Sequence, residues 1–362
     1  MGGHHAVITN LAQHHRERGV GSVAVLVSQG SDPKLPRENW RGFEHIIEVT
    51  LRRPGDLASM FGVADAVRRT RPSVVVAHSH RHLPAAWMGM LLCGRRPRLV
   101  LAEHQPIGLR GLGDEVFSLL GVLLSQGVVL LTESYLARYR WRRLAQTLRR
   151  RVVVIPNGVP VREVGAEPLQ STYSAVTVGM AGRLVRSKDP ITFVEAARLV
   201  VRRSAMSEVQ FVIAGDGPER EHLEDCIRRH ALEDKVRLVG RLGTDQMDNF
   251  YRSLACFVQP GFGETLSMSV LEAGSHALPV VASDVIGLND LIVDGLTGIL
   301  VPPADPGALA AGIIRVLQNR NIGPRLRDEV AEKFRGERVA DLYLQFLGQC
   351  APVLAVRDCA DD

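Results

Sequence analysis

The sequence predicts an α/β protein with two parallel-sheet, Rossmann-like domains in series. Short runs rich in Val, Ile and Leu alternate with longer amphipathic stretches, and these runs lack the apolar–polar alternation of half-exposed strands. The chain has 362 residues, enough for two domains of ordinary size. Its charge is also divided: residues 1–160 hold 22 Lys and Arg against 11 Asp and Glu, a net +11, whereas residues 161–362 hold 22 against 28, a net −6.

The first half alternates expected strands with expected helices. Each strand is a short run of β-branched and aliphatic residues, and each helix is a longer stretch with one apolar face. The strands are expected at 22–27, 73–79, 98–104, 127–132 and 151–157. The helices are expected at 5–18, 56–70, 84–93 and 134–148.

The second half repeats the pattern. Strands are expected at 175–182, 209–215, 236–241, 255–260 and 278–283. Helices are expected at 190–203, 217–230, 245–253, 265–276 and 306–319, and a final amphipathic stretch at 326–347 ends the fold. In open parallel sheets, ligands bind beyond the carboxyl ends of the strands, and polar residues and glycines gather there in this sequence. Two sheets whose strand ends face each other would form a cleft between the domains.

Composition indicates a packed, cytosolic protein. No apolar run reaches the ~18 residues that suggest a membrane span. The opening residues, Met-Gly-Gly-His-His, do not form a signal peptide. The five cysteines are scattered, and no pair has zinc-ligand spacing, so reduced thiols are expected. The basic first half predicts contact with something anionic.

Two basic residues flank the first turn of the second half. In "AGRLVRSKDP" (181–190), Arg183 and Lys188 lie between an expected strand and an expected helix. Two cations near a helix N-terminus suit a diphosphate. The alternative is a solvated basic turn.

Two glycines follow the next strand. In "IAGDGPEREHL" (213–223), Gly215 and Gly217 permit a tight turn and a close approach of backbone to a ligand. The pattern falls short of Gly-x-Gly-x-x-Gly because Arg220 stands at its last position. A plain strand-to-helix turn, with Pro218 in the first helical turn, explains most of it.

Two glutamates follow a Gly-Phe-Gly turn in "PGFGETLSMSVLEAGSHALPVVASD" (260–284). If a helix begins at Thr265, Glu264 and Glu272 lie roughly 12 Å apart along its axis. That spacing is too long for the carboxylate pair of a hydrolase, which is ~5–9.5 Å. It suits an extended ligand with polar groups at both ends. The alternative is one capping and one surface glutamate.

Histidines and arginines mark the first half. His78, His80 and His82 alternate and could bind a metal, although a polar strand-end loop is the plainer interpretation. His104 ends its own strand and is placed to face a cleft, with a core histidine as the alternative. Residues 138–151 carry seven arginines. A solvated helix face, an anionic membrane surface or nucleic acid would each account for them, but no nucleic-acid motif accompanies the charge.

Together these segments resemble the family 4 glycosyltransferases, retaining enzymes of the GT-B fold. The resemblance covers almost the whole chain and rests on motifs in a fixed order. They are "GGHHAVITNLAQHHRERG" (2–19), "VIPNGV" (154–159), "GRLVRSKDP" (182–190), "IAGDGPEREHL" (213–223), the Glu264-x7-Glu272 signature, and "VVASDVIGLNDLIVDGLTGILVPPADPGALA" (280–310).

The resemblance implies two facing Rossmann-like domains with an interdomain cleft. Residues 1–158 would bind the acceptor and 159–335 the nucleotide sugar, with 336–362 returning to the first domain as a helix. Arg183, Lys188, Glu264 and His104 would be catalytic: the two cations would hold the diphosphate, Glu264 the sugar hydroxyls, and His104 would lie near the transferred sugar. The implied donor-binding residues are Gly3, Gly182, Gly215, Gly217, Gly263, Thr265, Leu266 and Glu272, of which Glu272 would bind the ribose. No metal or other cofactor is implied.

The sequence departs from the family pattern at several positions. The family places a β-strand before the Gly-Gly loop, and this sequence begins at that loop, so we expect either an upstream start or an impaired first domain. In the later motifs, Leu266 and Ser267 replace a Phe-Gly pair, Ala277 a glycine, Ile286 the first of two glycines and Asp290 a glutamate. These changes bear on donor identity more than on donor binding.

The expected function is transfer of a hexose or N-acetylhexosamine from a UDP- or GDP-sugar to a hydroxyl of a cell-envelope glycan or lipid-linked saccharide. The expected location is cytoplasmic, on the inner face of the membrane, without nucleic acid as a partner. A non-catalytic nucleotide-sugar-binding or scaffold protein is the first alternative. A nucleotide-sugar epimerase is the second, and the Glu-x7-Glu context argues against it.

Overall fold

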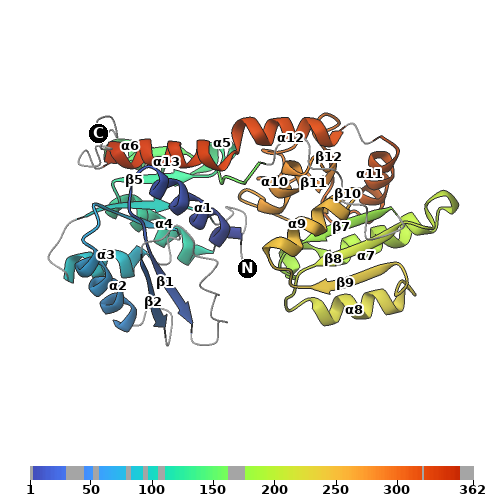
Figure 1. Ribbon diagram of the computed structural model, residues 1–362, viewed down its shortest axis with the longest axis horizontal. Coiled ribbons are helices and arrows are strands. Elements are labelled where there is room, and N and C mark those ends of the chain that lie inside the picture. Colours follow the sequence, from blue (N-terminus) through green and yellow to red (C-terminus); the bar gives the residue numbers. More distant parts are fainter. Residues whose placement is uncertain are drawn as a thin grey trace. The chain divides into compact units, whose positions relative to one another are not determined.

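The structure is a computed structural model that describes residues 3–29, 45–51, 57–78, 83–92, 97–104, 111–161, 176–319 and 322–350. The chain divides into two compact units, drawn in Figure 1. Unit 1 combines Met1–Gly158 with Gly336–Asp362, and unit 2 is Val159–Arg335.

Unit 1 contains two parallel sheets among the described residues. β1 (Val23–Gln29) pairs with β2 (His45–Leu51). A second sheet has the order β3-β4-β5-β6. Its strands are β3 (Val74–Ala77), β4 (Arg98–Ala102), β5 (Gly127–Leu130) and β6 (Arg151–Val154). Among the described residues of this unit, β1 pairs only with β2 and β3 only with β4, so no hydrogen-bonded strand pair joins the two sheets.

Along the chain of unit 1, one helix precedes β1 and the next five lie between the strands from β2 to β6. They are α1 (Gly3–Glu17), α2 (Leu57–Thr70), α3 (Leu83–Leu92), α4 (Leu112–Leu124), α5 (Glu133–Arg138) and α6 (Arg142–Thr147). The predicted helix 134–148 is two helices, because Tyr139 takes an extended conformation and is buried. β2 and α4 were not predicted. The apolar run of α4 continues almost directly into β5, so the two elements read as one segment.

The last helix, α13 (Gly336–Cys350), belongs to unit 1 and lies beside α1 in Figure 1. The Nη2 of Arg18 lies 2.7 Å from the Oδ1 of Asp341, which joins the two helices. Gly127 in β5 makes room for α13, since a Cβ there would lie 2.5 Å from the ring of Phe346. The final helix is therefore packed against both a helix and the sheet of this unit.

Unit 2 is a single six-stranded parallel sheet with the order β12-β11-β10-β7-β8-β9. Its strands are β7 (Thr177–Ala181), β8 (Gln210–Ala214), β9 (Val236–Gly240), β10 (Cys256–Gln259), β11 (Val280–Ser283) and β12 (Ile299–Val301). The first five lie within the predicted runs. β12 was not predicted, because three residues are too few to give a periodic signal.

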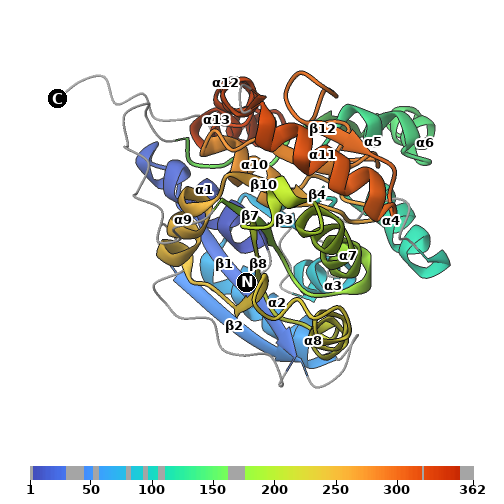
Figure 2. The same ribbon diagram turned by 90° about the vertical axis from the view of Figure 1, so that its right-hand side faces the viewer.

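Helices cover both faces of this sheet. α7 (Pro190–Val201), α8 (Arg220–Arg229) and α11 (Pro306–Gln318) pack with the strands into one apolar core, and α7 and α11 lie side by side in Figure 2. α9 (Thr244–Ser253), α10 (Met268–Ser275) and α12 (Ile322–Lys333) cover the other face. The final amphipathic stretch expected at 326–347 forms two helices, α12 and α13, and Arg335 between them pairs with Val159.

Candidate functional site

Three loops of unit 2 gather at the carboxyl ends of neighbouring strands. They are residues 182–188 after β7, 215–219 after β8 and 260–267 after β10, and we call them the strand-end loops. The order β10-β7-β8 makes these strands adjacent, so their loops meet at one edge of the sheet. All residues of unit 2 that the sequence placed in the site lie in these loops, except Glu272.

The first two strand-end loops are locked together through glycine. Gly215 has φ +142°, and a Cβ on it would lie 1.8 Å from the carbonyl oxygen of Gly182. A Cβ on Gly217 would lie 2.4 Å from the carbonyl oxygen of Leu184, whose own N–H donates to Asp216. These two glycines are therefore required by the contact between the loops. A plain strand-to-helix turn, the alternative given for residues 213–223, therefore explains Gly215 and Gly217 without a ligand.

Two other glycines leave space at the surface of the loops. No heavy atom lies within 4 Å of a Cβ built on Gly182 or on Gly263. Gly182 has φ +155°, which disfavours any side chain for conformational reasons, whereas Gly263 has neither restriction. Of the predicted donor-binding glycines in unit 2, these two are the ones that a ligand can approach.

Lys188 and Glu264 come together as an ion pair between the first and third loops. Gly261 allows this, because its lack of a Cβ lets the third loop pass close to the carbonyl oxygen of Ser187, to which Phe262 donates at 2.9 Å. The Lys188 ammonium contacts the Oε1 of Glu264, and both side chains are mostly buried. A cation and a carboxylate are thus held at one point beside the strand ends.

The buried side chain of Gln259 forms a hydrogen bond with Glu264. The Nε2 of Gln259 donates to the same Oε1 at 3.2 Å, and the Oγ of Ser269 donates to the Oε1 of Gln259 at 3.0 Å. The described residues place no hydrogen bond on the Oε2 of Glu264. Sequence reasoning missed Gln259, although a glutamine at the end of an apolar strand was a visible signal.

Arg183 is separate from this pair. Its side chain is exposed, and that side chain forms no hydrogen bond or ion pair with any described residue. The guanidinium is therefore available to an anionic ligand. The structure brings Lys188 and Glu264 into contact and places Arg183 nearby in the same loop as Lys188.

The third loop differs from the prediction. The helix was expected to begin at Thr265, but α10 begins at Met268, after Ser267 in extended conformation. Gly287, with φ +86°, packs against the carbonyl oxygens of Glu264 and Thr265 and holds them in a loop. Glu264 is therefore not at a helix mouth, and the 12 Å axial spacing does not apply. Thr265 and Leu266 are buried, so their side chains are not displayed to solvent.

Glu272 lies on α10, in a second group of polar side chains that includes Tyr251, His276 and Asp248. Its Oε2 accepts a hydrogen bond from the hydroxyl of Tyr251 at 2.8 Å. Burial raises the pKa of the Glu272 carboxyl, while the Tyr251 hydrogen bond and the charge of His276 act in the opposite direction. His276 also contacts the Oδ1 of Asp248 at 2.8 Å, which fixes its ring. Tyr251 is a second residue that sequence reasoning missed, because nothing in its local pattern distinguishes it from a core tyrosine.

The predicted residues of unit 1 fall at other strand ends. His104 follows β4 and is buried, and its Nε2 lies 3.1 Å from the Nδ1 of His78, which follows β3. The two rings stack with centroids 5.4 Å apart. His80 and His82 lie outside the described residues. Gly3 is the first residue of α1.

A separate set of residues in unit 2 has ligands suited to a metal. Glu195, Cys226 and His230 are the only group of three or more such side chains found together among the described residues. Glu195 lies in α7, Cys226 in α8 and His230 directly after α8, and none of them lies in the three strand-end loops. Cys226, Cys256 and Cys350 are buried free thiols, as expected of reduced cysteines.

Within the described residues, we find no helix with the length and apolar character needed to cross a bilayer.

Two family descriptions match the chain. Residues 1–163 match Glycosyltransferase Family 4, and residues 175–319 match Glycosyl transferases group 1. The first match lies mostly in unit 1 and the second lies in unit 2. Each match falls on the half of the chain in which its motifs were recognised.

Curated relatives and a solved structure agree with these matches. Over 151 residues, 42% of this chain, the sequence is 37% identical to the alpha-D-kanosaminyltransferase of Streptomyces kanamyceticus. Over 214 residues, 54% of the chain, it is 25% identical to the Escherichia coli UDP-Gal:alpha-D-GlcNAc-diphosphoundecaprenol alpha-1,3-galactosyltransferase. These matches span 38% and 55% of the two relatives, so the chain spans about half the length of the curated relatives it matches.

The fold itself is shared with the Anabaena protein HepE, whose structure was solved in complex with UDP and glucose. The two superpose with a TM-score of 0.77, at 17% identity, over 96% of each chain. This likeness confirms the GT-B class that the sequence predicted, and the cleft between the units stays a prediction. With both family descriptions matched in order along the chain, the protein belongs to the family 4 glycosyltransferases, also described as glycosyl transferases group 1.

Proposed function

We propose that the protein is a retaining glycosyltransferase that moves a sugar from a UDP- or GDP-sugar to a hydroxyl acceptor. The observation that carries the proposal is the Lys188–Glu264 pair at the strand ends, with the free guanidinium of Arg183 in the same loop. A cation for the diphosphate and a carboxylate for sugar hydroxyls are the two groups that such a donor requires. Relatives named as sugar transferases support the activity, and a neighbour of the same fold holding UDP supports the uridine nucleotide.

The two cations would act on the leaving group. A lysine ammonium has three donors, so Lys188 can bind a phosphate oxygen while it keeps its contact with Glu264. Arg183 would add a bidentate contact to the same diphosphate. As the bond between the anomeric carbon and the diphosphate breaks, negative charge develops on the leaving phosphate, and both cations stabilise it in the transition state.

The carboxylates would hold the two sugars of the donor. The Oε2 of Glu264 faces no described partner and would accept from hydroxyls of the transferred sugar. Glu272, with its Oε2 engaged by Tyr251, would accept a ribose hydroxyl at its Oε1. The acceptor hydroxyl would attack from the side of the leaving diphosphate and pass its proton to the departing phosphate oxygen, which retains the anomeric configuration. The chain's own residues supply all the groups of this scheme, so no metal or other cofactor is proposed for it.

Nucleotide release tests the activity. The full chain would be incubated with UDP-, GDP-, ADP- and TDP-sugars and with lipid-linked or soluble glycan acceptors, and the free nucleoside diphosphate would be measured. We expect release with one uridine or guanosine donor, rising when an acceptor is added. Binding of a donor without release under any acceptor would instead favour a non-catalytic sugar-nucleotide-binding protein.

Tyr251 gives a prediction for donor affinity. Tyr251→Phe removes the hydroxyl that orients the Glu272 carboxylate, so we expect the donor KM to rise about threefold to tenfold, roughly 1 kcal/mol of binding, with kcat unchanged. That hydrogen bond lowers the pKa of Glu272, so its loss raises this pKa further. The carboxylate then loses its acceptor capacity at a higher pH, and the acidic rise of the donor KM moves to higher pH.

A pH profile of the donor KM checks this effect. Tyr343→Phe is the matched control, because Tyr343 is a buried tyrosine in α13 that lies far along the chain from Glu272. An unshifted profile in Tyr251→Phe would show that Tyr251 is only a core side chain.

We further propose that the acceptor is a cell-envelope glycan or lipid-linked saccharide and that unit 1 meets an anionic, cytoplasmic membrane surface. In the segment 138–151, every arginine except Arg150 is exposed, although Arg151 donates to the Oε1 of Gln349 and the Arg140 guanidinium lies over the Trp141 ring. The galactosyltransferase relative is named for an undecaprenyl-diphosphate acceptor, which supports a lipid-linked substrate.

Vesicle binding checks the membrane proposal. Arg142 and Arg143 are exposed neighbours at the start of α6, and their double replacement by Ser should weaken binding to phosphatidylserine vesicles about 30-fold, at about 1 kcal/mol for each arginine. Arg202 and Arg203, an exposed pair in unit 2, form the matched control and should have little effect. Equal binding by both double variants, or no binding by the unmodified protein, would contradict the proposal.

A further inference from the structure

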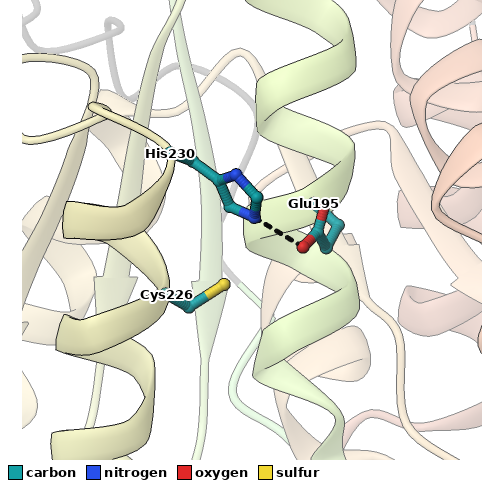
Figure 3. Close-up of side chains that lie close together, drawn as sticks. All are labelled: Glu195, Cys226 and His230. Carbon is teal, nitrogen blue, oxygen red and sulfur yellow. Dashed lines mark hydrogen bonds and ion pairs between the residues drawn. The ribbon is translucent and has the colours of Figure 1, made fainter.

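Three side chains meet between two helices of unit 2, away from the strand-end loops (Figure 3). Glu195 lies in the middle of α7, Cys226 lies in α8, and His230 follows the last residue of α8. The Nε2 of His230 is 2.7 Å from the Oε1 of Glu195. One carboxylate oxygen, one ring nitrogen and the Cys226 sulfur all lie within 4.8 Å of one another.

The local fold explains why these groups face each other. Cys226 and His230 are four residues apart, which places both on the same side of α8. α7 and α8 are neighbours on one face of the sheet, and Glu195 projects from α7 toward that side. Cys226 is 1% exposed, whereas the side chains of Glu195 and His230 are each 26% exposed. The thiol is therefore the buried member of the group, whereas the carboxylate and the imidazole are partly exposed to solvent.

We propose that Glu195, Cys226 and His230 bind a divalent transition-metal ion, with Zn²⁺ the best match. A thiolate, an imidazole and a carboxylate are the three ligand types that zinc takes in proteins, at about 2.0–2.3 Å from the metal. Three protein ligands leave a fourth tetrahedral position, which a water molecule reaches from the solvent-exposed side. Around an ion, the His230 Nε2 and Glu195 Oε1 would move apart from their 2.7 Å contact to the roughly 3.3 Å between two tetrahedral ligands, and the thiolate lies within 4.8 Å of both.

The surroundings contain two supporting features and two opposing charges. The Nε of Arg198 donates to the Oε2 of Glu195 at 3.1 Å, which orients the carboxylate and leaves its Oε1 for the metal. The site also lies at the C-terminal end of α8, where the helix dipole favours a cation. Against this, Arg198 and Arg229 are close enough to act on the charge of Cys226, and both repel a metal ion.

The protonation states follow from the ligand set. Burial raises the pKa of the Cys226 thiol, and the charge of Glu195 raises it further, so the metal-free cysteine carries its proton at neutral pH. Binding forms the metal–sulfur bond and releases that proton to solvent. His230 binds through Nε2 and keeps its ring proton on Nδ1. The Nε2 contact to Glu195 in the metal-free protein is thereby replaced by two bonds to the ion.

The simpler alternative is that the Glu195 carboxylate pairs with both His230 and Arg198, beside a cysteine that belongs only to the core. It accounts for the same distances, and it predicts that removal of the thiol has no effect on metal binding. The metal site would clamp α7 to α8 and does not depend on the proposed sugar transfer. Cys226 and His230 lie six and ten residues past the start of α8, about 9–15 Å from the strand-end loop at that end of the helix.

Cobalt titration separates the two accounts. Reduced full-length protein, freed of metal by a chelator, would be titrated with Co²⁺ and then with Zn²⁺ as competitor. We expect a thiolate-to-cobalt charge-transfer band in the near ultraviolet that saturates at one equivalent and disappears when Zn²⁺ is added. The band should be lost in Cys226→Ser, and the apparent affinity should fall at least about tenfold in His230→Ala.

Control variants keep the result decisive. His222 and Glu219 form a pair at the other end of α8, 3.3 Å apart, and His222→Ala should leave the band unchanged. His230→Ala alters a partly exposed side chain and tests the site even if Cys226→Ser fails to fold, as circular dichroism would reveal. A band that persists in Cys226→Ser, or cobalt binding without any thiolate band in the unmodified protein, would overturn the proposal.

Discussion

Lys188→Ala is expected to lower kcat/KM for the sugar nucleotide by about 10²–10³-fold. The variant removes the ammonium that contacts Glu264 and that, in our scheme, stabilises the leaving diphosphate. Because that charge develops mainly in the transition state, most of the loss should be in kcat and less in the donor KM. Initial rates of nucleotide release at several donor concentrations measure both constants.

A matched variant isolates the effect of the charge. Lys333→Ala also breaks a lysine–glutamate pair, the exposed contact to Glu329 at 2.6 Å in α12, and should leave the rate unchanged. Lys188→Arg should recover part of the activity, because a guanidinium can also hold a diphosphate. Thermal unfolding of each variant shows whether Glu264 tolerates the loss of its partner. A kcat/KM within threefold of the unmodified protein would remove Lys188 from the proposed mechanism.

Gly215→Ala is expected to destabilise unit 2 by about 2–6 kcal/mol, the sum of a strained backbone and an overpacked contact. The glycine has φ +142°, and a Cβ would lie 1.8 Å from the Gly182 carbonyl oxygen. The change must therefore push the first two strand-end loops apart. Urea unfolding followed by circular dichroism measures the free energy of unfolding.

Gly263→Ala is the matched comparison for Gly215. It introduces the same methyl group into another strand-end loop, at a position where no heavy atom lies within 4 Å. Its free energy of unfolding should change by less than about 0.5 kcal/mol, whereas its donor KM should rise if a donor passes close to Gly263. Equal stability of the two alanine variants would show that the loops are not locked at Gly215 as described.

The sequence predicted the repeating strands and helices because each was long and bounded by polar turns. All five predicted strands of unit 2 and most helices exist near the expected residues. Elements were missed where the pattern was short or merged with a neighbour, as for β12 and α4. The described strands of unit 1 form two sheets, and which strands pair is not encoded in the local pattern of either partner.

The site was predicted in part for a similar reason. Motif spacing placed Lys188 and Glu264 in loops that the sheet order makes adjacent, but it gave no sign that they form an ion pair across 76 residues. The helix start was wrong because the backbone at Glu264 and Thr265 packs against Gly287, 23 residues beyond Glu264, and no local pattern signals that contact. At Ala277 the residue type departs from the family's glycine, but the backbone conformation does not. Ala277 takes φ +56°, the conformation that a glycine would favour there.

The most direct test of the account is calorimetric titration of nucleoside diphosphates into the full chain. The central claim is that the strand-end loops of unit 2 bind a diphosphate through Arg183 and Lys188. We predict that UDP or GDP binds with one-to-one stoichiometry and that Arg183→Ala weakens this binding at least about tenfold, roughly 1.4 kcal/mol. Arg202→Ala, an exposed arginine beyond α7, should bind as the unmodified protein does. Failure of UDP, GDP, ADP and TDP to bind, or equal binding by Arg183→Ala, would contradict the claim.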